Sequence, residues 1–509
     1  MGSNGNITKI SNGHLTETAQ KEYTSYAKTM QSNAAKKVNE HSGDGVVFGE
    51  PKDMKYQTVD TIDIVAGIFF DGTLNNKFNT DNKITGKGKG SYGNDYSNIA
   101  RLFTFYQEIG NIISIYTEGI GTQINGLDDT PGKGFGAGDT GILKKVKIGC
   151  ENLLPKISKV AGKKTINKIT FDVFGFSRGA AAARNFIYEI TKPSYRPVPF
   201  WEGDKVKYYL DEHEEITMLE IMPAGGILGK MLAKSNIKVK KLHVRFVGLF
   251  DTVSSYSESG FSIAPKFDND VKELHLDQIY RADKIVHFTA ADEHRKFFAL
   301  THIQTMGKNR IEIEFPGVHS DIGGSYHDGF ENVDEILDGE ERELIIEKRR
   351  LVNDGWYLDK QLTVHSFLEK LSGKRYVHKQ YSYIPLSFMC EFACDKSTQV
   401  NFDQKGLNEK YNIDEVKSIN PLNFIRSKLH NYAFNGGSAL EFKYYKQLQD
   451  DLKSGKITGR DYNQQLVEQK NIRELRNKFL HWSADYDGLG DPFKPNFENN
   501  KRKRITYEG

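Results

Sequence analysis

Three stretches of the chain concentrate apolar residues in the way that β-strands do. They are residues 169–174 (ITFDVF), 242–250 (LHVRFVGLF) and 311–315 (IEIEF). The first two are rich in β-branched and aromatic side chains, as buried strands are, and the third alternates apolar and charged residues. Residues 180–190 (AAAARNFIYEI) instead combine strong helix formers with isoleucines at helical spacing. The pattern therefore predicts a strand followed directly by a helix, and two further strands later in the chain.

The turn between the first strand and the helix reads Gly175-Phe176-Ser177-Arg178-Gly179. A Gly-x-Ser-x-Gly between a strand and a helix matches the nucleophile elbow, in which a strained turn lifts the serine hydroxyl clear of the sheet. Gly175 and Gly179 are needed because a β-carbon at either position would clash with the neighbouring strand or helix. An ordinary glycine-bracketed turn has the same letters, so the interpretation depends on partners for Ser177.

Partners for Ser177 follow in order along the chain. The second strand ends at Asp251, and the third leads through Pro316-Gly317 to His319, on a loop closed by two glycines. A serine hydroxyl needs an imidazole to take its proton and a carboxylate to hold that imidazole in the right tautomer. Singly, an Asp-Thr pair is often a helix N-cap and such a histidine is often structural. Together, the order Ser, Asp, His predicts the triad of an α/β-hydrolase.

The segment Asp71-Gly72-Thr73 follows an apolar stretch and is expected to form the oxyanion loop after the first core strand. The backbone N–H of Gly72 or Thr73 would join that of Arg178 in holding the oxyanion, with Asp71 shaping the loop. Which of the two loop amides points inward stays open. A phosphotransferase of the haloacid dehalogenase type needs Asp-x-Asp here, and Phe69 occupies the position of its first aspartate.

Other charged residues are interpreted as supports of this site. Asp321 is a rival to Asp251 as the triad acid, but two residues of separation from His319 favour a role in pinning the loop. Residues 292–295 are expected to form an ion-pair lattice, and Arg184 is expected to brace a loop through a carboxylate. Histidines and aspartates in this region match no zinc or calcium spacing, so neither a metal nor a cofactor is expected.

Six motifs in this order resemble the first class of type VI secretion lipase effectors and the wider bacterial and fungal α/β-hydrolase family around them. They are IFFDGTLNN (68–76), YTEGIGT (116–122), GFSRGAAAAR (175–184), GLFDTV (248–253), AADEHRKFF (290–298) and FPGVHSDIGG (315–324). The ending FLHWS (479–483) is also similar to that family's closing segment. The resemblance implies an esterase acting on lipids, with Ser177 as nucleophile, Asp251 as acid and His319 as base. The second motif departs from the family, which usually has aspartate where this chain has Glu118.

Composition narrows the classes of function. The formal net charge of +3 over 509 residues is too small to argue for nucleic acid. Three cysteines form no disulfide framework, which fits assembly in a reducing cytoplasm. The first residues lack the apolar core of a signal peptide, and no apolar run approaches the length needed to span a bilayer.

The fold expected is α/β, an α/β-hydrolase core with an inserted cap or lid and a helical C-terminal extension. Residues 1–58 are expected to be a flexible N-terminal arm, 59–330 the catalytic core and 331–509 a helical extension packed on it. The insertion, 192–241, mixes small and apolar residues with lysines. It suits a lid that meets an anionic lipid surface, although a packed helical hairpin with a basic rim fits equally well.

The function expected is that of a serine-dependent phospholipase A, made in the bacterial cytoplasm and delivered by a type VI system to the periplasm or membrane of a target cell. Its partners would be membrane phospholipid, a secretion-spike protein and a cognate immunity protein, without nucleic acid. Two alternatives remain, namely an esterase of small or carbohydrate esters and a non-catalytic spike adaptor on a hydrolase scaffold. The sequence leaves open whether the sn-1 or the sn-2 ester is cut.

Overall fold

The computed structural model divides the chain into two units, Met1–Thr58 and Val59–Gly509. The described residues are 60–82, 90–126, 128, 141–212, 214–254, 271–305, 307–414, 421–485, 494–498 and 501–509. The expected N-terminal arm, residues 1–58, lies outside them.

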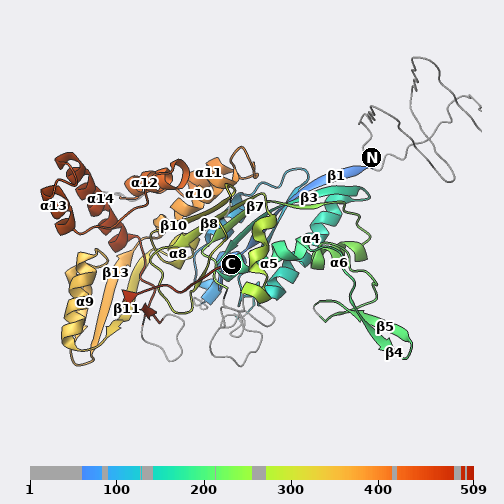
Figure 1. The fold of residues 1–509 in the computed structure, drawn as a ribbon, viewed down its shortest axis with the longest axis horizontal. Helices are drawn as coiled ribbons and strands as arrows, with labels where there is room; N and C mark the ends of the chain where they lie inside the picture. Colours follow the sequence, from blue (N-terminus) through green and yellow to red (C-terminus); the bar gives the residue numbers. More distant parts are fainter. Residues whose placement is uncertain are drawn as a thin grey trace, which may run out of the picture. The chain divides into compact units, whose positions relative to one another are not determined.

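The second unit is built on a six-stranded sheet in which every neighbouring pair of strands is parallel (Figure 1). The strand order is β10 (Arg310–Phe315), β8 (Lys284–Ala290), β7 (Leu242–Phe250), β3 (Thr165–Phe176), β1 (Thr61–Phe70) and β2 (Ile112–Thr117). Because the strands are parallel, their carboxyl ends meet at one edge, where ligands bind in sheets of this kind. The prediction of an α/β fold is confirmed, and all three predicted strands are present.

Helices cover both faces of the sheet, so its strands are apolar on both sides. One face carries α4 (Ile142–Ala161), α5 (Arg178–Thr191) and α6 (Gly226–Lys234), packed on strand residues such as Ile68 and Val173. The opposite face carries α2 (Asn98–Phe105) and α10 (Tyr383–Ala393), packed on the phenylalanines of the strands. The other helices of the described residues are α1 (Lys77–Asn82), η1 (Gly90–Tyr92), η3 (Leu276–Arg281), α8 (His319–Gly323), α9 (Glu341–Asn353), η4 (Asp359–Gln361), η5 (Lys379–Ser382), α11 (Gln404–Lys410), α12 (Leu422–Asn435), α13 (Tyr445–Lys453) and α14 (Gly459–Lys478).

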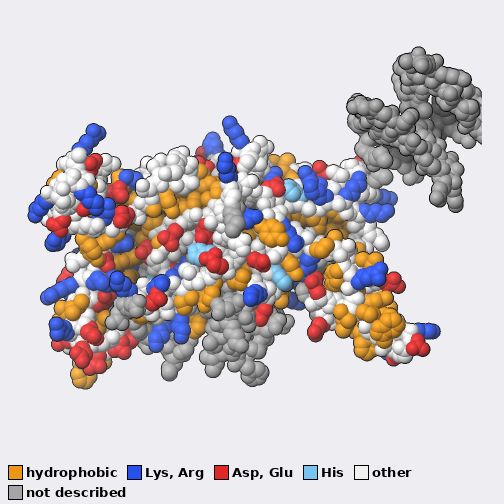
Figure 2. Space-filling view, in the orientation of Figure 1, with side chains coloured by type: hydrophobic (Ala, Val, Ile, Leu, Met, Phe, Trp, Pro, Cys, Tyr) orange, Lys and Arg blue, Asp and Glu red, His pale blue; other side chains and the backbone are white. Residues whose placement is uncertain are grey.

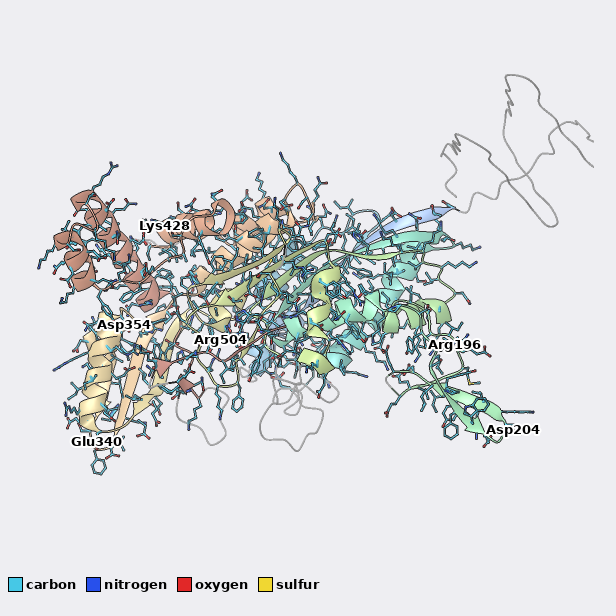
Figure 3. The ribbon with its side chains drawn as sticks, in the orientation of Figure 1. Arg196, Asp204, Glu340, Asp354, Lys428 and Arg504 are labelled. Carbon is cyan, nitrogen blue, oxygen red and sulfur yellow. The ribbon has the colours of Figure 1, made fainter. Side chains whose placement is uncertain are left out.

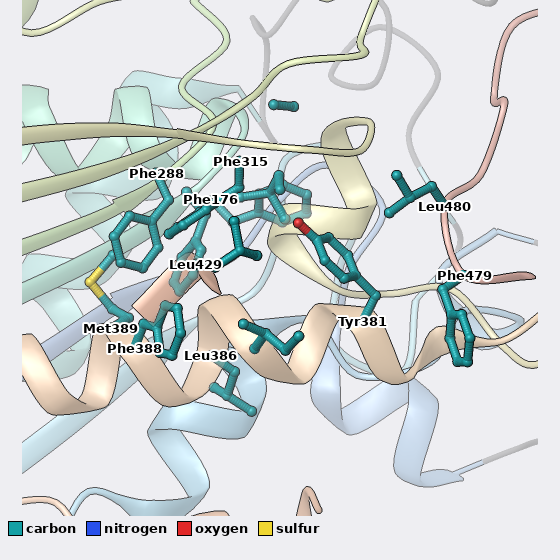
Figure 4. Close-up of a cluster of buried hydrophobic side chains, with 14 of the residues drawn as sticks. Phe176, Phe288, Phe315, Tyr381, Leu386, Phe388, Met389, Leu429, Phe479 and Leu480 are labelled. Atoms are coloured by element: carbon teal, nitrogen blue, oxygen red, sulfur yellow. The ribbon is translucent and has the colours of Figure 1, made fainter. Parts of the chain in front are cut away.

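The region after residue 330 shares its hydrophobic core with the sheet (Figure 4). Phe388 and Met389 of α10 lie against Phe288 of β8 and Phe315 of β10, and all four side chains are buried. Helix α10 is apolar nearly all round, as a helix covered on every side must be. The extension therefore stabilises the strands that lead into the proposed site.

The extension is not wholly helical, and this part of the prediction is wrong. It begins with an antiparallel three-stranded sheet of β11 (Gly329–Asp338), β13 (Lys370–Val377) and β12 (Leu362–His365). Residues 331–338, expected to be part of the helical extension, belong to β11, which pairs with β13 on both sides of an irregularity between Val333 and Leu337. Helix α9 starts only at Glu341.

The insertion 192–241 contains a small antiparallel sheet followed by α6, so it is neither a helical hairpin nor a continuous apolar helix. The sheet consists of β4 (Val198–Glu202), β5 (Lys205–Leu210) and β6 (Ile216–Thr217). Trp201 in β4 and Met218 just after β6 are 58% and 75% exposed, and apolar side chains gather over the hairpin at the lower right of Figure 2. Of the lysines expected to meet lipid, Lys230 is instead buried in an ion pair with Asp211.

Short strands complete the second unit. Strand β16 (Thr506–Tyr507) pairs in parallel with β9 (Leu300–Thr301), which follows β8 in the chain. Strands β14 (Phe497–Glu498) and β15 (Lys501–Arg502) form a hairpin just before β16. The C-terminal segment, residues 494–498 and 501–509, is thereby held beside the carboxyl end of the sheet.

Candidate active site

Ser177 lies in a sharp turn between β3 and α5, with φ 58° and ψ −130°, a conformation that costs energy for any residue other than glycine. A β-carbon on Gly175 would fall 2.6 Å from the backbone of Ala180. A β-carbon on Gly179 would fall 2.2 Å from the carbonyl oxygen of Asp71. Glycine is therefore required on both sides of Ser177, as the elbow interpretation demands, and the turn packs directly against the loop after β1.

Asp251 and His319 form a buried pair at the same edge of the sheet. Asp251 follows the last residue of β7 with φ 45°, and its Oδ2 accepts a hydrogen bond from His319 Nδ1 at 2.5 Å. With Nδ1 as the donor, Nε2 is the nitrogen left to take a proton. His319 begins the short helix α8, so the segment predicted as a loop contains a helical turn. Burial lowers the pKa of His319 below its usual value, which favours the neutral imidazole that a general base needs.

The backbone joins the serine turn to this pair. Ser177 N donates to Phe250 O at 3.0 Å, and Val253 N donates to Ser177 O at 3.3 Å. Backbone hydrogen bonds therefore join the turn to residues before and after Asp251 in the chain. The ring of Phe176 also packs on the imidazole of His319, with centroids 4.6 Å apart. Within the described residues no hydrogen bond links the Ser177 hydroxyl to His319. Such catalytic hydrogen bonds are commonly long before substrate binds.

Arg504, in the C-terminal segment, forms a bidentate ion pair with Asp251. Its Nη1 and Nη2 donate to Oδ1 and Oδ2 of the carboxylate, each at 2.7 Å. Burial alone would raise the pKa of Asp251, but the Arg504 charge and the His319 hydrogen bond outweigh it and hold that pKa well below the usual range. Nothing in the sequence around Arg504 indicated this contact.

The expected oxyanion loop lies against the turn and is held by Asp71. The Asp71 carboxylate accepts hydrogen bonds from the Gly72 amide at 2.7 Å and from the Tyr116 hydroxyl at 2.5 Å. Burial raises the pKa of Asp71 to about 6. The Gly72 amide is thus already engaged, which favours Thr73 as the loop amide that faces a substrate. Arg178 Nε donates to the Thr73 hydroxyl at 2.8 Å and joins this loop to the elbow.

Glu118, where the family resemblance led us to expect aspartate, is paired with a buried lysine. Lys145 Nζ donates to Glu118 Oε1 at 2.8 Å and to the carbonyl oxygen of Thr122 at 2.8 Å. The segment 118–122 lies over the loop of residues 71–73, since a β-carbon on Gly119 would fall 1.7 Å from Gly72 O. The longer glutamate side chain therefore reaches the lysine that holds this covering segment.

Asp321 bonds away from the imidazole of His319. Its carboxylate accepts from Val318 N at 3.0 Å and from the backbone and ring of His481 at 3.0 and 2.7 Å. These hydrogen bonds hold the start of α8 and join it to His481. Arg184 braces loops too, but it donates to the carbonyl oxygens of Leu276, Thr301 and His302 where a carboxylate partner was expected.

The charged residues that follow β8 form the expected ion-pair lattice, and they hold the backbone of the segment that carries His319. Glu293 binds Arg295 through two hydrogen bonds of 2.9 and 2.6 Å and also accepts from His319 N at 3.2 Å. Asp292 accepts from the amide of Gly317 at 2.7 Å. Across the described parts of the chain, the His, Cys, Asp and Glu side chains form no group of three or more that could hold a metal ion.

The fold and these residues define an α/β protein whose parallel sheet carries an elbow serine and a buried aspartate–histidine pair at its carboxyl edge. The family model for the catalytic domain of Tle1-like phospholipase effectors of the type VI secretion system matches residues 203–345. That span includes Asp251 and His319, and Ser177 precedes it. The resemblance seen in the sequence motifs is therefore confirmed.

One solved structure agrees on the fold. A chain titled "Structure of the Tle1 effector bound to the VgrG spike from the Type 6 secretion system" is 19% identical, with a TM-score of 0.52, and the match covers 92% of this chain and 99% of that one. An uncharacterized protein from Pseudomonas aeruginosa is 16% identical, with a TM-score of 0.38, over 74% of this chain and 51% of the other. No curated protein matches this sequence.

Proposed function

We propose that this protein is a serine esterase of the phospholipase A type with an α/β-hydrolase core, and an antibacterial effector of a type VI secretion system. The observation that carries the proposal is the hydrogen bond from His319 to buried Asp251. Backbone hydrogen bonds join the residues on either side of Asp251 to the strained turn that contains Ser177. The match to the Tle1-like catalytic domain supports phospholipid as the substrate class.

In the proposed reaction His319 Nε2 takes the proton of Ser177 Oγ as that oxygen attacks the acyl carbon of a fatty-acyl ester. The backbone amide of Arg178, first in α5, and that of Thr73 hold the oxyanion, since N–H groups at a helix start point towards bound anions. His319 then protonates the leaving lysolipid oxygen. Water repeats the cycle on the acyl-enzyme and releases the fatty acid.

Asp251 serves this reaction by fixing the imidazole and by stabilising its charged form. Because Nδ1 is committed to Asp251, only Nε2 can exchange a proton with Ser177. Phe176 and Phe298 flank the ring, with centroids 4.6 and 5.0 Å from it, and keep water away from the pair. Neither a metal nor a cofactor takes part in the proposed cycle.

Delivery and partners form a second part of the proposal. The structural similarity to a Tle1 effector titled as bound to the VgrG spike supports a spike protein as a partner of this chain too. A producing cell would also need an immunity protein against the released enzyme. Among the described residues no helix is both long and apolar enough to cross a bilayer. The enzyme would act from the membrane surface after delivery to a target cell.

Hydrolysis of mixed phospholipid vesicles by the wild type and by Ser177→Ala tests the function, with released fatty acids identified by mass spectrometry. Release that disappears in Ser177→Ala supports a serine phospholipase, and mixed-chain lipids then reveal the sn position. If the wild type cleaves a short-chain ester but no vesicle lipid, it is a small-ester hydrolase. Inactivity on both substrates favours the spike adaptor.

The exposed apolar residues of the β4–β5 hairpin are proposed to contact the lipid surface. Trp201→Ser should reduce vesicle hydrolysis about tenfold, because an indole buried among lipid headgroups contributes on the order of 1.5 kcal/mol, and should leave short-chain ester hydrolysis unchanged. Phe367→Ser is the matched control, since Phe367 is 97% exposed in the turn between β12 and β13. Equal losses in both variants would contradict a lipid-contacting hairpin.

A further inference from the structure

Arg504, in the C-terminal segment, forms an ion pair with Asp251, the proposed catalytic acid. Arg504 and Asp251 are separated by 253 positions in the sequence, yet the guanidinium binds both carboxylate oxygens, at 2.7 Å each. Both side chains are buried, with 8% of the Arg504 side chain and none of the Asp251 side chain exposed. Figure 3 labels Arg504 in the middle of the unit, away from Asp204 in the turn between β4 and β5.

The backbone around Arg504 is itself held in place. Leu300 N donates to Ile505 O at 2.9 Å and His302 N donates to Tyr507 O at 2.8 Å, in register with the pairing of β16 and β9. Arg504 Nε donates to the carbonyl oxygen of Phe298 at 2.9 Å. The guanidinium is therefore oriented from both sides, by the strand that carries it and by the segment beneath it.

Four hydrogen bonds converge on the Asp251 carboxylate. Oδ1 accepts from Ala290 N at 2.9 Å and from Arg504, and Oδ2 accepts from His319 and from Arg504. A carboxylate held in this way cannot rotate, so its lone pair stays aimed at His319 Nδ1. It also shares its negative charge between two cations whenever His319 is protonated.

The second cation has an electrostatic consequence for the imidazole. An opposite charge stabilises a carboxylate, and a carboxylate already paired with arginine stabilises a neighbouring imidazolium less well. The charged groups around His319 are Asp251, which follows β7, and Glu293 and Arg295 from the segment after β8. Glu293 is already paired with Arg295, so Arg504 is the cation that acts directly on the acid of the pair.

We propose that Arg504 is a positioning residue for the reaction of Ser177: it locks the Asp251 carboxylate against His319 and limits how readily the imidazole takes up a proton. The inference rests on the proposed function for its catalytic meaning, but its effect on His319 can be observed without any substrate.

The experiment compares the full-length wild type with Arg504→Met, Arg504→Lys and Arg502→Met. Arg502 is the matched control, because it lies two residues away in the same segment but pairs with Glu347 and stacks on Trp482. The protonation midpoint of His319 is followed by NMR of ¹³Cε1-labelled histidines, assigned with His319→Gln. In parallel, kcat/KM for a soluble short-chain ester is measured against pH.

Arg504→Met should raise the protonation midpoint of His319, and with it the acidic limb of kcat/KM, by about one pH unit. Arg504→Lys keeps the charge but not the bidentate geometry. The acidic limb of its kcat/KM profile should therefore stay in place, while kcat falls about tenfold. Arg502→Met should change neither quantity. A residue that only holds the chain end in place would lower the rate without moving the midpoint.

An unmoved midpoint in Arg504→Met, or an equal shift in Arg502→Met, overturns the inference. If the wild type cleaves no ester, the proposed function fails, while the NMR midpoint of His319 still decides the role of Arg504. If Arg504→Met does not fold, Arg504→Gln takes its place: it also removes the charge, so a raised midpoint supports the inference and an unmoved midpoint overturns it.

Discussion

Replacing Asp251 by asparagine removes an acceptor from a position where every neighbour is a donor. The carboxylate accepts from His319 Nδ1, from both terminal nitrogens of Arg504 and from Ala290 N. Asparagine has one oxygen and one NH₂ group, so at least one donor must then face another donor. If the NH₂ group faces His319, the imidazole takes the other tautomer and Nε2 can no longer accept the proton of Ser177.

Two magnitudes follow from this geometry. The wrong tautomer should lower kcat by about 10⁴, which is roughly 5 kcal/mol of activation barrier. The variant also leaves Arg504 without its carboxylate at a site where only 8% of the arginine side chain is exposed. Removing one partner of a buried ion pair costs about 3–5 kcal/mol, so we expect Asp251→Asn to lose stability as well as activity.

The assay pairs kcat on a short-chain ester with the free energy of unfolding in urea. Asp251→Asn combined with Arg504→Met should recover much of the stability, because no buried charge is left unpaired, and should stay inactive. Asp321→Asn is the control acid, since Asp321 bonds to Val318 and His481 and should cost far less rate. If Asp321→Asn abolishes activity while Asp251→Asn keeps it, Asp251 is not the acid.

Three further predictions concern the elbow, its covering segment and the base. Gly179→Ala should cost about 1–3 kcal/mol in thermal unfolding and at least tenfold in kcat, because its β-carbon would lie 2.2 Å from Asp71 O; unchanged kcat would contradict the close packing. Glu118→Asp should cost about 1–3 kcal/mol in urea unfolding, because the shorter side chain no longer reaches buried Lys145, and wild-type stability would argue against that ion pair. The acidic limb of kcat/KM should have its midpoint below pH 6.5, because burial lowers the pKa of His319 and only the neutral ring can act; a midpoint above 6.5 would contradict this.

Local patterns were sufficient to predict the parts of the fold that local chemistry determines. The strand at 242–250 is found with the same bounds as β7, and the strand and helix around Ser177 are found as β3 and α5. These segments are buried on both faces, so their apolar content alone identifies them. The glycines beside Ser177 could be interpreted from sequence for the same reason, since steric exclusion acts between near neighbours.

Contacts between distant parts of the chain could not be predicted in this way. Arg504 lies in a lysine- and arginine-rich ending that resembles a solvated tail, and only the pairing of β16 with β9 brings it to Asp251. Strand β11 was missed because its acidic residues resemble a helix surface. Of its apolar residues, only Val333 and Ile336 are buried. His481 likewise gave no local sign that it binds Asp321.

The central claim, that Ser177 is the nucleophile of an acyl transfer, is tested most directly by chemical trapping. The wild type is incubated with a long-chain alkyl fluorophosphonate, and the modified residue is located by peptide mass spectrometry. The account predicts one adduct, on Ser177, that is absent in Ser177→Ala and forms far more slowly in Asp251→Asn. An adduct on another residue, or ester hydrolysis that persists in Ser177→Ala, would contradict it.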